Sequence, residues 1–598
     1  MLYPLTVLVA VAIATWAFVY GDQPVILDAA GYVELAKAIV AGGPGAFASD
    51  TRTYAYPAFL AVIIRVVGQD VVDVQTAVFV VQLASLLAAA WIGARRIGGA
   101  LGLDGVGPAI FVATAANPFL LINAVQVLTE LPATVLLYVA VALSLPQQHA
   151  ERPTQVTLLA VCALLCAGLA VMVRPASLIM VPVVVGIWVV RARVFRDVPW
   201  KALPVGLLAL ALPFVPQVLS NQRAFGVASP LIVRSLYTDM MVVGFEYAKT
   251  AALVIPGAPT ALSYHNPFRP PPELTIRQVI LERPDLFLGT LAVHTFALLD
   301  QDYAFTYIRD VDPWHRWPLS TLSNLFFLGA IVGLVVGLRR TANAPPATIN
   351  RRRFALLALG AAALSVVAVY VPTQVENRYA LPLYPLLAAP FVIAVSRISV
   401  AVPTAGASRL ALGATVIAIW LGGAAMLSVW LQAQAPMLVA LREGSIGPRA
   451  IAQRVRPVAG PTPSPGPTAP PAREVPLATY LADLPKDLTA KRLAAFDVTV
   501  TNAGHEIWNV QGAYPVNVAA RFVAQTTELH ERVKGVMRDS QSVALPNDVA
   551  PGESATVRLQ ITAPPVPGRY TLRVHVTRAG LPDSDTVIER LVRVVTGR

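Results

Sequence analysis

Apolar stretches long enough to cross a lipid bilayer recur throughout the first 432 residues of this chain. A helix needs about 20 residues to cross roughly 30 Å of hydrocarbon. Only 13% of the residues are charged, whereas a soluble protein carries about 25%. The sequence therefore predicts an all-α polytopic membrane bundle with about eleven transmembrane helices. The predicted spans are residues 2–19, 71–94, 106–122, 124–145, 155–173, 176–190, 198–219, 318–338, 354–371, 380–396 and 410–432.

Arginine clusters follow every second predicted span. Loops rich in Lys and Arg stay in the cytoplasm, and an N-terminus on the inside places every internal cluster there. The same topology accounts for the net charge of +12 without nucleic acid as a partner. An odd number of spans then leaves the C-terminus outside. The short apolar run 286–299 is interpreted as an interfacial or re-entrant helix, because as a true span it would invert all that follows.

The chain changes character after residue 432. The stretch 456–473 reads RPVAGPTPSPGPTAPPAR, which is typical of a stiff, extended linker. Beyond it, segments such as FDVTVTN and YTLRVHVT alternate apolar and polar residues between turn signals, as in antiparallel β-sandwiches. The predicted domains are a transmembrane domain, 1–432, with outer loops at 20–70 and 220–317, a juxtamembrane segment and linker, 433–473, and an extracytoplasmic immunoglobulin-like β-sandwich, 474–598.

Ionisable side chains gather on the predicted outer face of the membrane. Such groups are costly in or beside a bilayer, so their presence there indicates a functional site. The two long outer loops and the outer ends of three spans supply them. They are Asp28, Arg52, Glu130, Arg174, His294, Asp300, Asp302, Glu376 and Arg378.

Four short segments present motifs in a characteristic order. An acidic residue lies early in the first outer loop, in LDAAGYVELAKAIVAGG, and an aromatic-proline motif follows in RTYAYPAFLAVI. A proline-led helix with an internal Thr-Glu comes next, in NPFLLINAVQVLTELPATVLLYVA, and an Arg-Tyr before prolines ends the set, in ENRYALPLYP. This pattern resembles the GT-C superfamily of membrane glycosyltransferases, particularly the protein O-mannosyltransferases and the aminoarabinose transferases that modify lipid A.

The resemblance implies an inverting enzyme that moves a sugar from a polyprenyl-phosphate donor to a glycan, lipid or protein acceptor. The reaction would occur at the extracytoplasmic face of a bacterial inner or plasma membrane, with membrane lipids as further partners. A carboxylate must take the proton of the acceptor hydroxyl, and cations must hold the leaving phosphate. We assign the first role to Asp28, with Asp22 as its substitute, and the second to Arg378, Arg52 and Arg174, because a guanidinium binds phosphate oxygens bidentately. Further substrate-site candidates are Tyr32, Tyr56, Glu130, His294, Asp300, Glu376 and Tyr379.

Each assignment has a structural alternative. Asp28 could cap the helix that follows it, and Arg378 could reach towards lipid head groups. Glu130 could pair with an arginine for structural reasons alone. In the aromatic segment 302–318, membrane-interface anchoring competes with stacking on a sugar or an isoprenyl chain.

The sequence contains no nucleotide-binding loop and no zinc-ligand spacing, so it predicts no cofactor and assigns no metal ligand. A divalent cation stays open, because two outer carboxylates could bind one through oxygen. In the C-terminal domain, Trp508 and Tyr514 could stack on a glycan. A buried core tryptophan is the alternative for Trp508.

Two other functions fit parts of the sequence. A transporter or flippase of lipid-linked sugars would also place polar groups among its spans, but near the bilayer midplane and in two related halves. The sequence has neither feature. The third alternative is a non-catalytic subunit of an envelope assembly, in which the β-sandwich serves as a scaffold.

Overall fold

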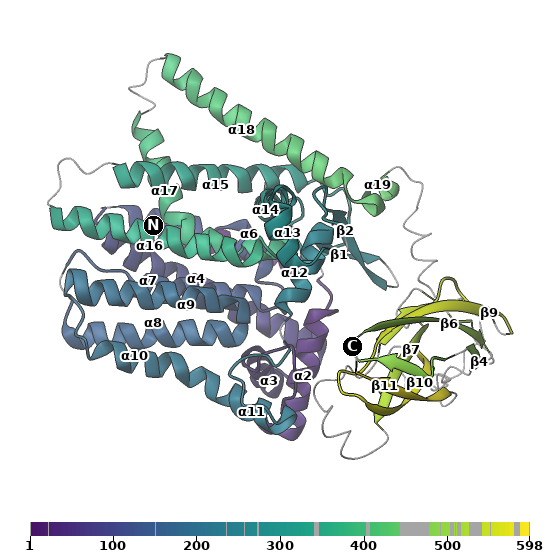
Figure 1. Ribbon diagram of the computed structural model, residues 1–598. Coiled ribbons are helices and arrows are strands. Elements are labelled where there is room, and N and C mark those ends of the chain that lie inside the picture. The colour runs from purple at the N-terminus through teal and green to yellow at the C-terminus, as the bar shows by residue number, and fades with distance from the viewer. Residues whose placement is uncertain are drawn as a thin grey trace, which may run out of the picture. The chain divides into compact units, whose positions relative to one another are not determined.

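A helical bundle and a β-domain make up the chain in the computed structural model (Figure 1). The first unit comprises Met1–Val254 and Thr260–Glu443, and the second contains Gly444–Arg598. Residues 443–473, which make up most of the predicted juxtamembrane segment and linker, lie outside the described residues. The structure describes residues 2–21, 23–103, 105–149, 151–234, 236–255, 258–271, 274–339, 346–401, 407–442, 478–482, 484–490, 492–502, 507–508, 510, 516–524, 541–550, 552–578 and 587–596.

Long apolar helices dominate the first unit. In the part of the chain that the structure describes, eight helical segments are long and apolar enough to cross a membrane. They are α1, α4, α8, α15, most of α16 and α18, and the segments Pro175–Phe195 and Ala202–Phe225, which contain α9 to α11. The prediction of a polytopic helical membrane bundle is thus confirmed. The helices are α1 (Leu2–Gly21), α2 (Asp28–Gly42), α3 (Ala55–Val67), α4 (Val71–Leu101), α5 (Val106–Ala115), α6 (Pro118–Asn123), α7 (Glu130–Ser144), α8 (Pro153–Val173), α9 (Met180–Val190), α10 (Ala202–Ala211), α11 (Val215–Phe225), α12 (Tyr237–Glu246), α13 (Ile276–Glu282), α14 (Pro284–Leu299), α15 (Arg316–Arg339), α16 (Pro346–Tyr370), α17 (Leu383–Ala401), α18 (Ala407–Ala433) and α19 (Pro436–Arg442).

The three remaining predicted spans correspond to shorter apolar helices, α5, α7 and α17. The run 106–122 is broken because the side chain of Asn117 accepts hydrogen bonds from the amides of the next helix, which starts at Pro118. The run 124–145 becomes helical only at Glu130. The side chain of Gln82 donates to two backbone carbonyls in the non-helical stretch before it, at 3.1 and 2.8 Å. A side-chain amide thereby satisfies backbone groups that a helix would otherwise pair internally.

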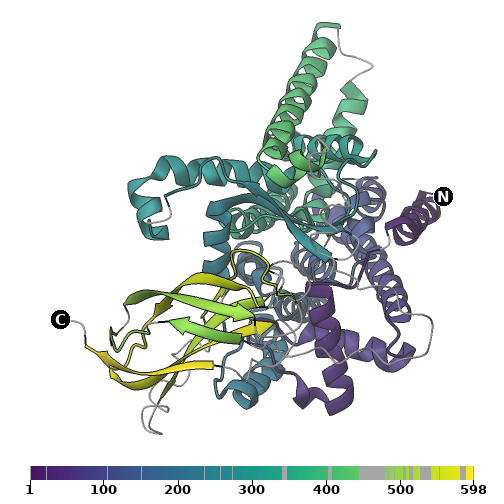
Figure 2. The same ribbon diagram turned by 90° about the vertical axis from the view of Figure 1, so that its right-hand side faces the viewer.

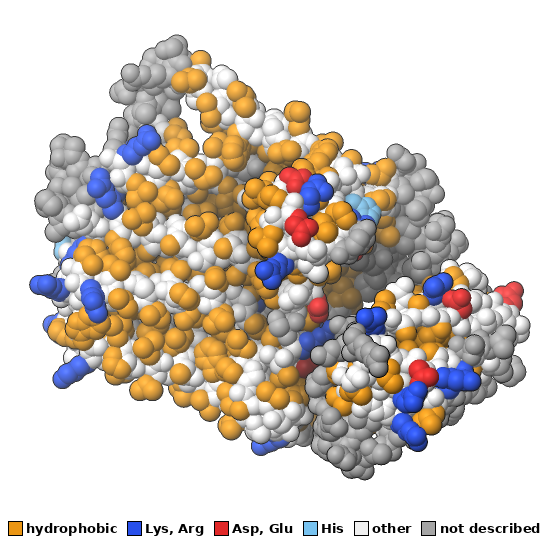
Figure 3. All heavy atoms as spheres, viewed as in Figure 1, with side chains coloured by type: hydrophobic (Ala, Val, Ile, Leu, Met, Phe, Trp, Pro, Cys, Tyr) orange, Lys and Arg blue, Asp and Glu red, His pale blue; other side chains and the backbone are white. Residues whose placement is uncertain are grey.

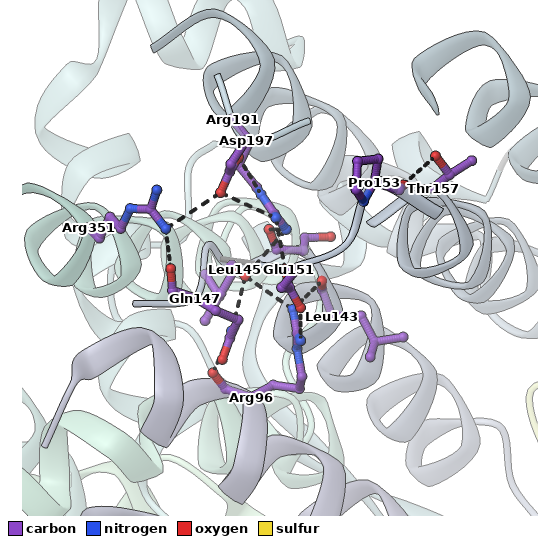
Figure 4. Close-up of polar contacts among 11 residues, drawn as sticks. Arg96, Leu143, Leu145, Gln147, Glu151, Pro153, Thr157, Arg191, Asp197 and Arg351 are labelled. Atoms are coloured by element: carbon purple, nitrogen blue, oxygen red, sulfur yellow. Dashed lines mark hydrogen bonds and ion pairs between the residues drawn. The ribbon is translucent and has the colours of Figure 1, made fainter. Parts of the chain in front are cut away.

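Charged clusters lie at both ends of α7, α8 and α16. At the end where α8 begins, Glu151 pairs with Arg96 at 2.5 Å and with the fully buried Arg191 at 3.2 Å. Asp197 pairs with Arg191 at 3.2 Å and contacts Arg351 of α16 at 3.8 Å (Figure 4). The 21 residues of α8 separate this cluster from the other end by about 32 Å at 1.5 Å per residue, which matches the hydrocarbon thickness of a bilayer.

The surface of the first unit follows the same division. Exposed leucine, isoleucine, valine and tryptophan side chains cover the flank of the helices in Figure 3, and Lys and Arg side chains gather at the end where α16 begins. Apolar side chains on the flank of a helical bundle suit contact with lipid. The surface therefore agrees with a bundle that crosses a membrane along its long axis.

At the opposite end of the bundle, short elements cross the long helices (Figure 2). They include α2 and α3, which pack on each other through buried residues such as Val33 and Leu60. A three-stranded sheet in the order β2-β1-β3 lies in the second loop, where the sequence predicted only a short helix. The strands are β1 (Tyr247–Ile255), β2 (Ala258–His265) and β3 (Tyr307–Ile308).

The second unit contains two β-sheets around one apolar core, as predicted for a β-sandwich. One sheet has the order β5-β11-β10-β7-β8 and the other β4-β6-β9. Trp508 is buried in the core between them, so the core interpretation of this residue is confirmed. Tyr514 lies outside the described residues. The strands are β4 (Ala478–Ala482), β5 (Asp487–Thr489), β6 (Leu493–Asn502), β7 (Val516–Ala524), β8 (Gln541–Ala544), β9 (Ser554–Thr562), β10 (Gly568–Arg578) and β11 (Val587–Val595).

Candidate active site

Asp28 is the first residue of α2 and follows a strained turn. The residue before it, Leu27, has a φ of 51°, a value that non-glycine residues rarely adopt. Backbone strain of this kind often accompanies functional sites. Leu27 is the N-cap residue of α2, and the Asp28 carboxylate accepts its hydrogen bonds from Arg52 and Arg378. The structure therefore does not support the alternative in which Asp28 serves only as a helix cap.

Two arginines from distant segments hold the Asp28 carboxylate. Arg52 Nη2 lies 3.0 Å from Oδ1, and Arg378 Nη2 lies 3.1 Å from Oδ2. Arg52 reaches this position because Gly31 of α2 has no side chain. A Cβ at Gly31 would lie 2.7 Å from Arg52 Nη1. The Arg52 guanidinium also lies over the ring of Tyr32, 4.9 Å from its centroid.

Arg378 contacts two further carboxylates besides Asp28. Its Nε lies 2.7 Å from Glu376 Oε2 and 3.1 Å from Glu130 Oε1, and the Tyr379 hydroxyl donates to Glu376 Oε1 at 3.1 Å. The side chain is only 9% exposed. A buried guanidinium with three carboxylate neighbours does not reach towards lipid head groups, so the structure contradicts that alternative.

Glu130 joins Arg378 to a second arginine. Arg174 Nη1 lies 2.7 Å from Glu130 Oε1, and Arg174 Nε donates to the Tyr370 hydroxyl at 2.7 Å. The other carboxylate oxygen of Glu130, Oε2, is buried and has no hydrogen-bond partner among the described residues. Glu130, both arginines and Tyr379 line a cavity of about 20 Å³, large enough for a single water molecule.

The charges of the site set the protonation state of Asp28. Burial on its own would raise the pKa of Asp28, but the charges and hydrogen bonds of Arg378 and Arg52 outweigh burial and hold the pKa below its ordinary value of 3.8. Asp28 is therefore a carboxylate at neutral pH. Three carboxylates and three guanidiniums from Asp28, Glu130, Glu376, Arg52, Arg174 and Arg378 make up the described cluster.

Each guanidinium of the cluster already contacts a carboxylate. Arg52 contacts Asp28 through Nη2 alone, so an incoming phosphate can bind its remaining N–H groups or take the place of Asp28. Asp28 and Arg52 are the most exposed members of the cluster, with 47% and 28% of their side chains accessible. An anion from solvent therefore meets Arg52 first and the buried Arg378 after it.

Other predicted site residues lie near the cluster or apart from it. Tyr56 packs edge-on against Tyr32, with ring centroids 5.2 Å apart. His294 is buried on α14, with Nδ1 2.7 Å from the carbonyl oxygen of Val371. Asp300 accepts hydrogen bonds from two serine hydroxyls on α15 and α18, each at 2.7 Å. The hydrogen bonds of His294 and Asp300 connect neighbouring helical segments and do not reach the arginine cluster in the part of the chain that the structure describes.

Two residues that the sequence did not single out, Lys249 and Asn377, contact Asp302 next to the site. Lys249 of β1 forms a buried ion pair with Asp302 at 2.7 Å. Asp302 also accepts a hydrogen bond at 3.1 Å from Asn377, the residue before Arg378. This network fixes the backbone segment that carries Arg378. An isolated lysine in the apolar run YAKTAALVI was the only signal for it in the sequence.

No set of metal ligands emerges within the described ranges. Among those residues, no three or more His, Cys, Asp and Glu side chains form a group that could hold a metal ion. Asp22, the substitute base, lies outside the described residues. The divalent cation that the sequence left open therefore has no assigned site.

Comparisons with known proteins find similarity to solved structures alone. Neither a protein-family model nor a curated sequence matches the chain. The fold is similar to the crystal structure of ArnT from Cupriavidus metallidurans in the apo state, with a TM-score of 0.41 and 14% identity, over 75% of this chain and 73% of that chain.

Proposed function

We propose that the chain is an integral-membrane glycosyltransferase that transfers one sugar from a polyprenyl-phosphate donor to a glycan, lipid or protein acceptor. The observation that carries this proposal is the Asp28 carboxylate with one guanidinium on each oxygen, Arg52 at 3.0 Å and Arg378 at 3.1 Å. A base next to two phosphate-binding cations is the set of groups that such a transfer needs.

In the proposed reaction Asp28 takes the proton of the acceptor hydroxyl. The acceptor oxygen forms a bond to the anomeric carbon of the donor sugar, and the bond from that carbon to the phosphate oxygen breaks. The electron pair of the broken bond stays on the polyprenyl phosphate, whose added charge Arg378 and Arg52 stabilise. A single displacement without a covalent intermediate inverts the anomeric configuration.

Donor binding would also activate the base. In the unliganded site Arg378 and Arg52 lower the pKa of Asp28, whereas burial raises it. A donor phosphate that draws the guanidiniums away leaves burial as the dominant influence, and the pKa of Asp28 then rises. Because a stronger base removes a hydroxyl proton more effectively, donor binding would increase the reactivity of Asp28.

We place the site on the extracytoplasmic face. The arginine-rich cluster around Arg191 and Arg351 lies at the opposite ends of α7, α8 and α16, where the positive-inside rule expects the cytoplasm. The charges also lie at helix ends, whereas a transporter would concentrate them near the midplane. This arrangement favours the transferase over the flippase.

Mass spectrometry of the cell envelope tests the proposal. After deletion of the gene, one sugar residue should be missing from one glycan, glycolipid or glycoprotein. Wild-type protein should restore that residue, and Asp28→Asn should not. Asp285→Asn is the matched control and should restore it, because Asp285 also pairs with an arginine, at 2.8 Å, but on the exposed start of α14. An unchanged set of envelope glycans after deletion would contradict the proposed function.

A further inference from the structure

A second, larger cavity is lined by Tyr307, whose hydroxyl bonds to the turn before Asp28. It has a volume of about 340 Å³ and forms where the end of α1 meets the segment 303–315. Ligand pockets in proteins typically measure about 300 to 1,000 Å³. The cavity inside the arginine cluster, at about 20 Å³, is far too small for a sugar ring.

Aromatic side chains converge on this cavity from two parts of the chain. Trp16 and Tyr20 come from α1, and Phe305 and Trp314 come from the later segment. The end of α1 and Phe305 approach closely because residue 21 is glycine, where a Cβ would lie 2.6 Å from the Phe305 ring. Aromatic residues that only anchor a protein at the membrane interface have no need to share one hollow.

The polar groups of the cavity carry both signs of charge. Arg309 and Asp310 line it together with His315. The Nδ1 atom of His315 is buried and has no hydrogen-bond partner among the residues described here. A purely anionic ligand would favour cations alone, whereas a sugar presents hydroxyls that both donate and accept. Aromatic faces with a few convergent polar groups are typical of small-ligand pockets, and the C–H faces of a sugar ring stack on such surfaces.

Hydrogen bonds connect this cavity to Asp28. The amide side chain of Gln23 donates to the Gly21 carbonyl at 2.8 Å and accepts from the Tyr307 amide at 3.3 Å. The Tyr307 hydroxyl donates to the Ile26 carbonyl at 3.0 Å. Ile26 lies two residues before Asp28, so the wall of the cavity and the strained turn at Asp28 form one connected unit.

We propose that this cavity is the subsite for a sugar ring of the acceptor. The inference rests on the proposed function, since a bound sugar there would present a hydroxyl beside the base. Trp314 supplies the main stacking surface and Asp310 accepts from a sugar hydroxyl. The site assigns a carbohydrate-containing acceptor, either a glycan or a glycolipid, over an unglycosylated protein.

Trp314→Ala tests the subsite, because the side chain is 79% exposed and its loss leaves no hole in the core. Trp317→Ala is the matched control. Trp317 lies one turn further along, is 43% exposed and contacts Arg316, but does not line the cavity. The full chain in nanodiscs is applied to an oligosaccharide array, and affinities for the bound glycans are then measured in solution.

Wild-type protein and Trp317→Ala should bind at least one glycan, and Trp314→Ala should bind it about ten-fold more weakly, the equivalent of about 1.4 kcal/mol. Asp310→Asn should lower the affinity for the same glycan, and its melting temperature should equal that of the wild type. Absence of glycan binding by wild-type protein overturns the subsite. Equal loss of glycan binding in the two tryptophan variants also overturns the subsite and assigns the aromatic residues to membrane anchoring instead.

Binding of polyprenyl monophosphate, measured on the same samples, separates this inference from the proposed function. If the protein binds a glycan through Trp314 but binds no polyprenyl phosphate, the sugar site is supported and the proposed transferase function is refuted. If it binds polyprenyl phosphate through Arg378 but binds no glycan, the donor site is supported and the acceptor subsite is refuted.

Discussion

Arg378→Ala should impair both the stability of the protein and its donor binding. Arg378 contacts Asp28, Glu130 and Glu376 at 2.7 to 3.1 Å, and its side chain is 9% exposed. Removing one partner from a buried ion pair costs about 3 to 5 kcal/mol, because the remaining charge stays out of water. Glu130 is 5% exposed but keeps Arg174 at 2.7 Å. We therefore expect the lower end, about 3 kcal/mol.

The conservative variant Arg378→Lys separates charge from geometry. Lysine keeps the positive charge, but a single ammonium cannot span three carboxylates or bind phosphate oxygens as a fork. We expect a loss of stability of about 1 kcal/mol, the scale of one hydrogen bond. Loss of the charge-assisted phosphate contact in Arg378→Ala is worth about 1.5 to 3 kcal/mol, equivalent to a roughly ten- to hundred-fold weaker donor affinity. The donor affinity of Arg378→Lys should lie between those of the wild type and Arg378→Ala.

The assay uses purified protein in nanodiscs. Unfolding is followed with and without polyprenyl monophosphate, and donor affinity is measured at a temperature where each variant is folded. Arg283→Ala is the control, since the Arg283 side chain is 45% exposed and pairs with the exposed Asp285; its loss should change stability and donor affinity far less than the loss of Arg378. Wild-type stability of Arg378→Ala, or unchanged donor affinity in the folded variant, would refute the role assigned to Arg378.

Three further predictions address other parts of the protein. In Arg52→Gln the pKa of Asp28 should rise, because one of the two cations that lower it is lost. The acid limb of the pH profile of kcat/KM should then move to higher pH, because Asp28 must be deprotonated to act as a base; an unchanged profile or a shift to lower pH would contradict this. Removal of residues 474–598 should weaken acceptor use more than donor hydrolysis, because the proposed base and phosphate ligands all precede residue 432; equal loss in a folded truncation would count against a binding role. A periplasmic reporter fused at residue 598 should be active, and activity of a cytoplasmic reporter there would reject the topology.

Much of the fold follows from hydrophobic patterning in the sequence. Apolar length located the long helices, and strict alternation located strands such as β6, β9 and β10. The breaks depend on particular side chains. Asn117 ends the helix in the predicted span 106–122 by bonding to the start of the next helix. Gln82 bonds to the non-helical start of the predicted span 124–145, a contact between distant segments that no local sequence pattern indicates. Strands β1 and β2 were not predicted, because short apolar runs do not distinguish a strand from a helix.

The sequence predicted which residues gather at the candidate site, but not which of them form ion pairs with one another. The sequence placed Asp28, Arg52, Glu130, Arg174 and Arg378 on one face, and the structure brings these five together. Which carboxylate meets which guanidinium depends on packing between segments up to 350 residues apart. The strain at the turn before α2 depends on a backbone angle. Neither property appears in residue type or spacing.

The most direct test of the proposed chemistry is single-turnover transfer by Asp28→Asn. Asp28 is half-exposed, and Arg378 keeps Glu130 and Glu376 in the variant, so the fold and donor binding should remain. The amide keeps the shape of the carboxylate but cannot take a proton, and general-base assistance contributes about 10²- to 10⁴-fold. We predict transfer slower by that factor at saturating polyprenyl-phosphate sugar. Near-normal transfer would move the base to Asp22 or Glu130, and near-normal transfer after substitution of all three would contradict the glycosyltransferase itself.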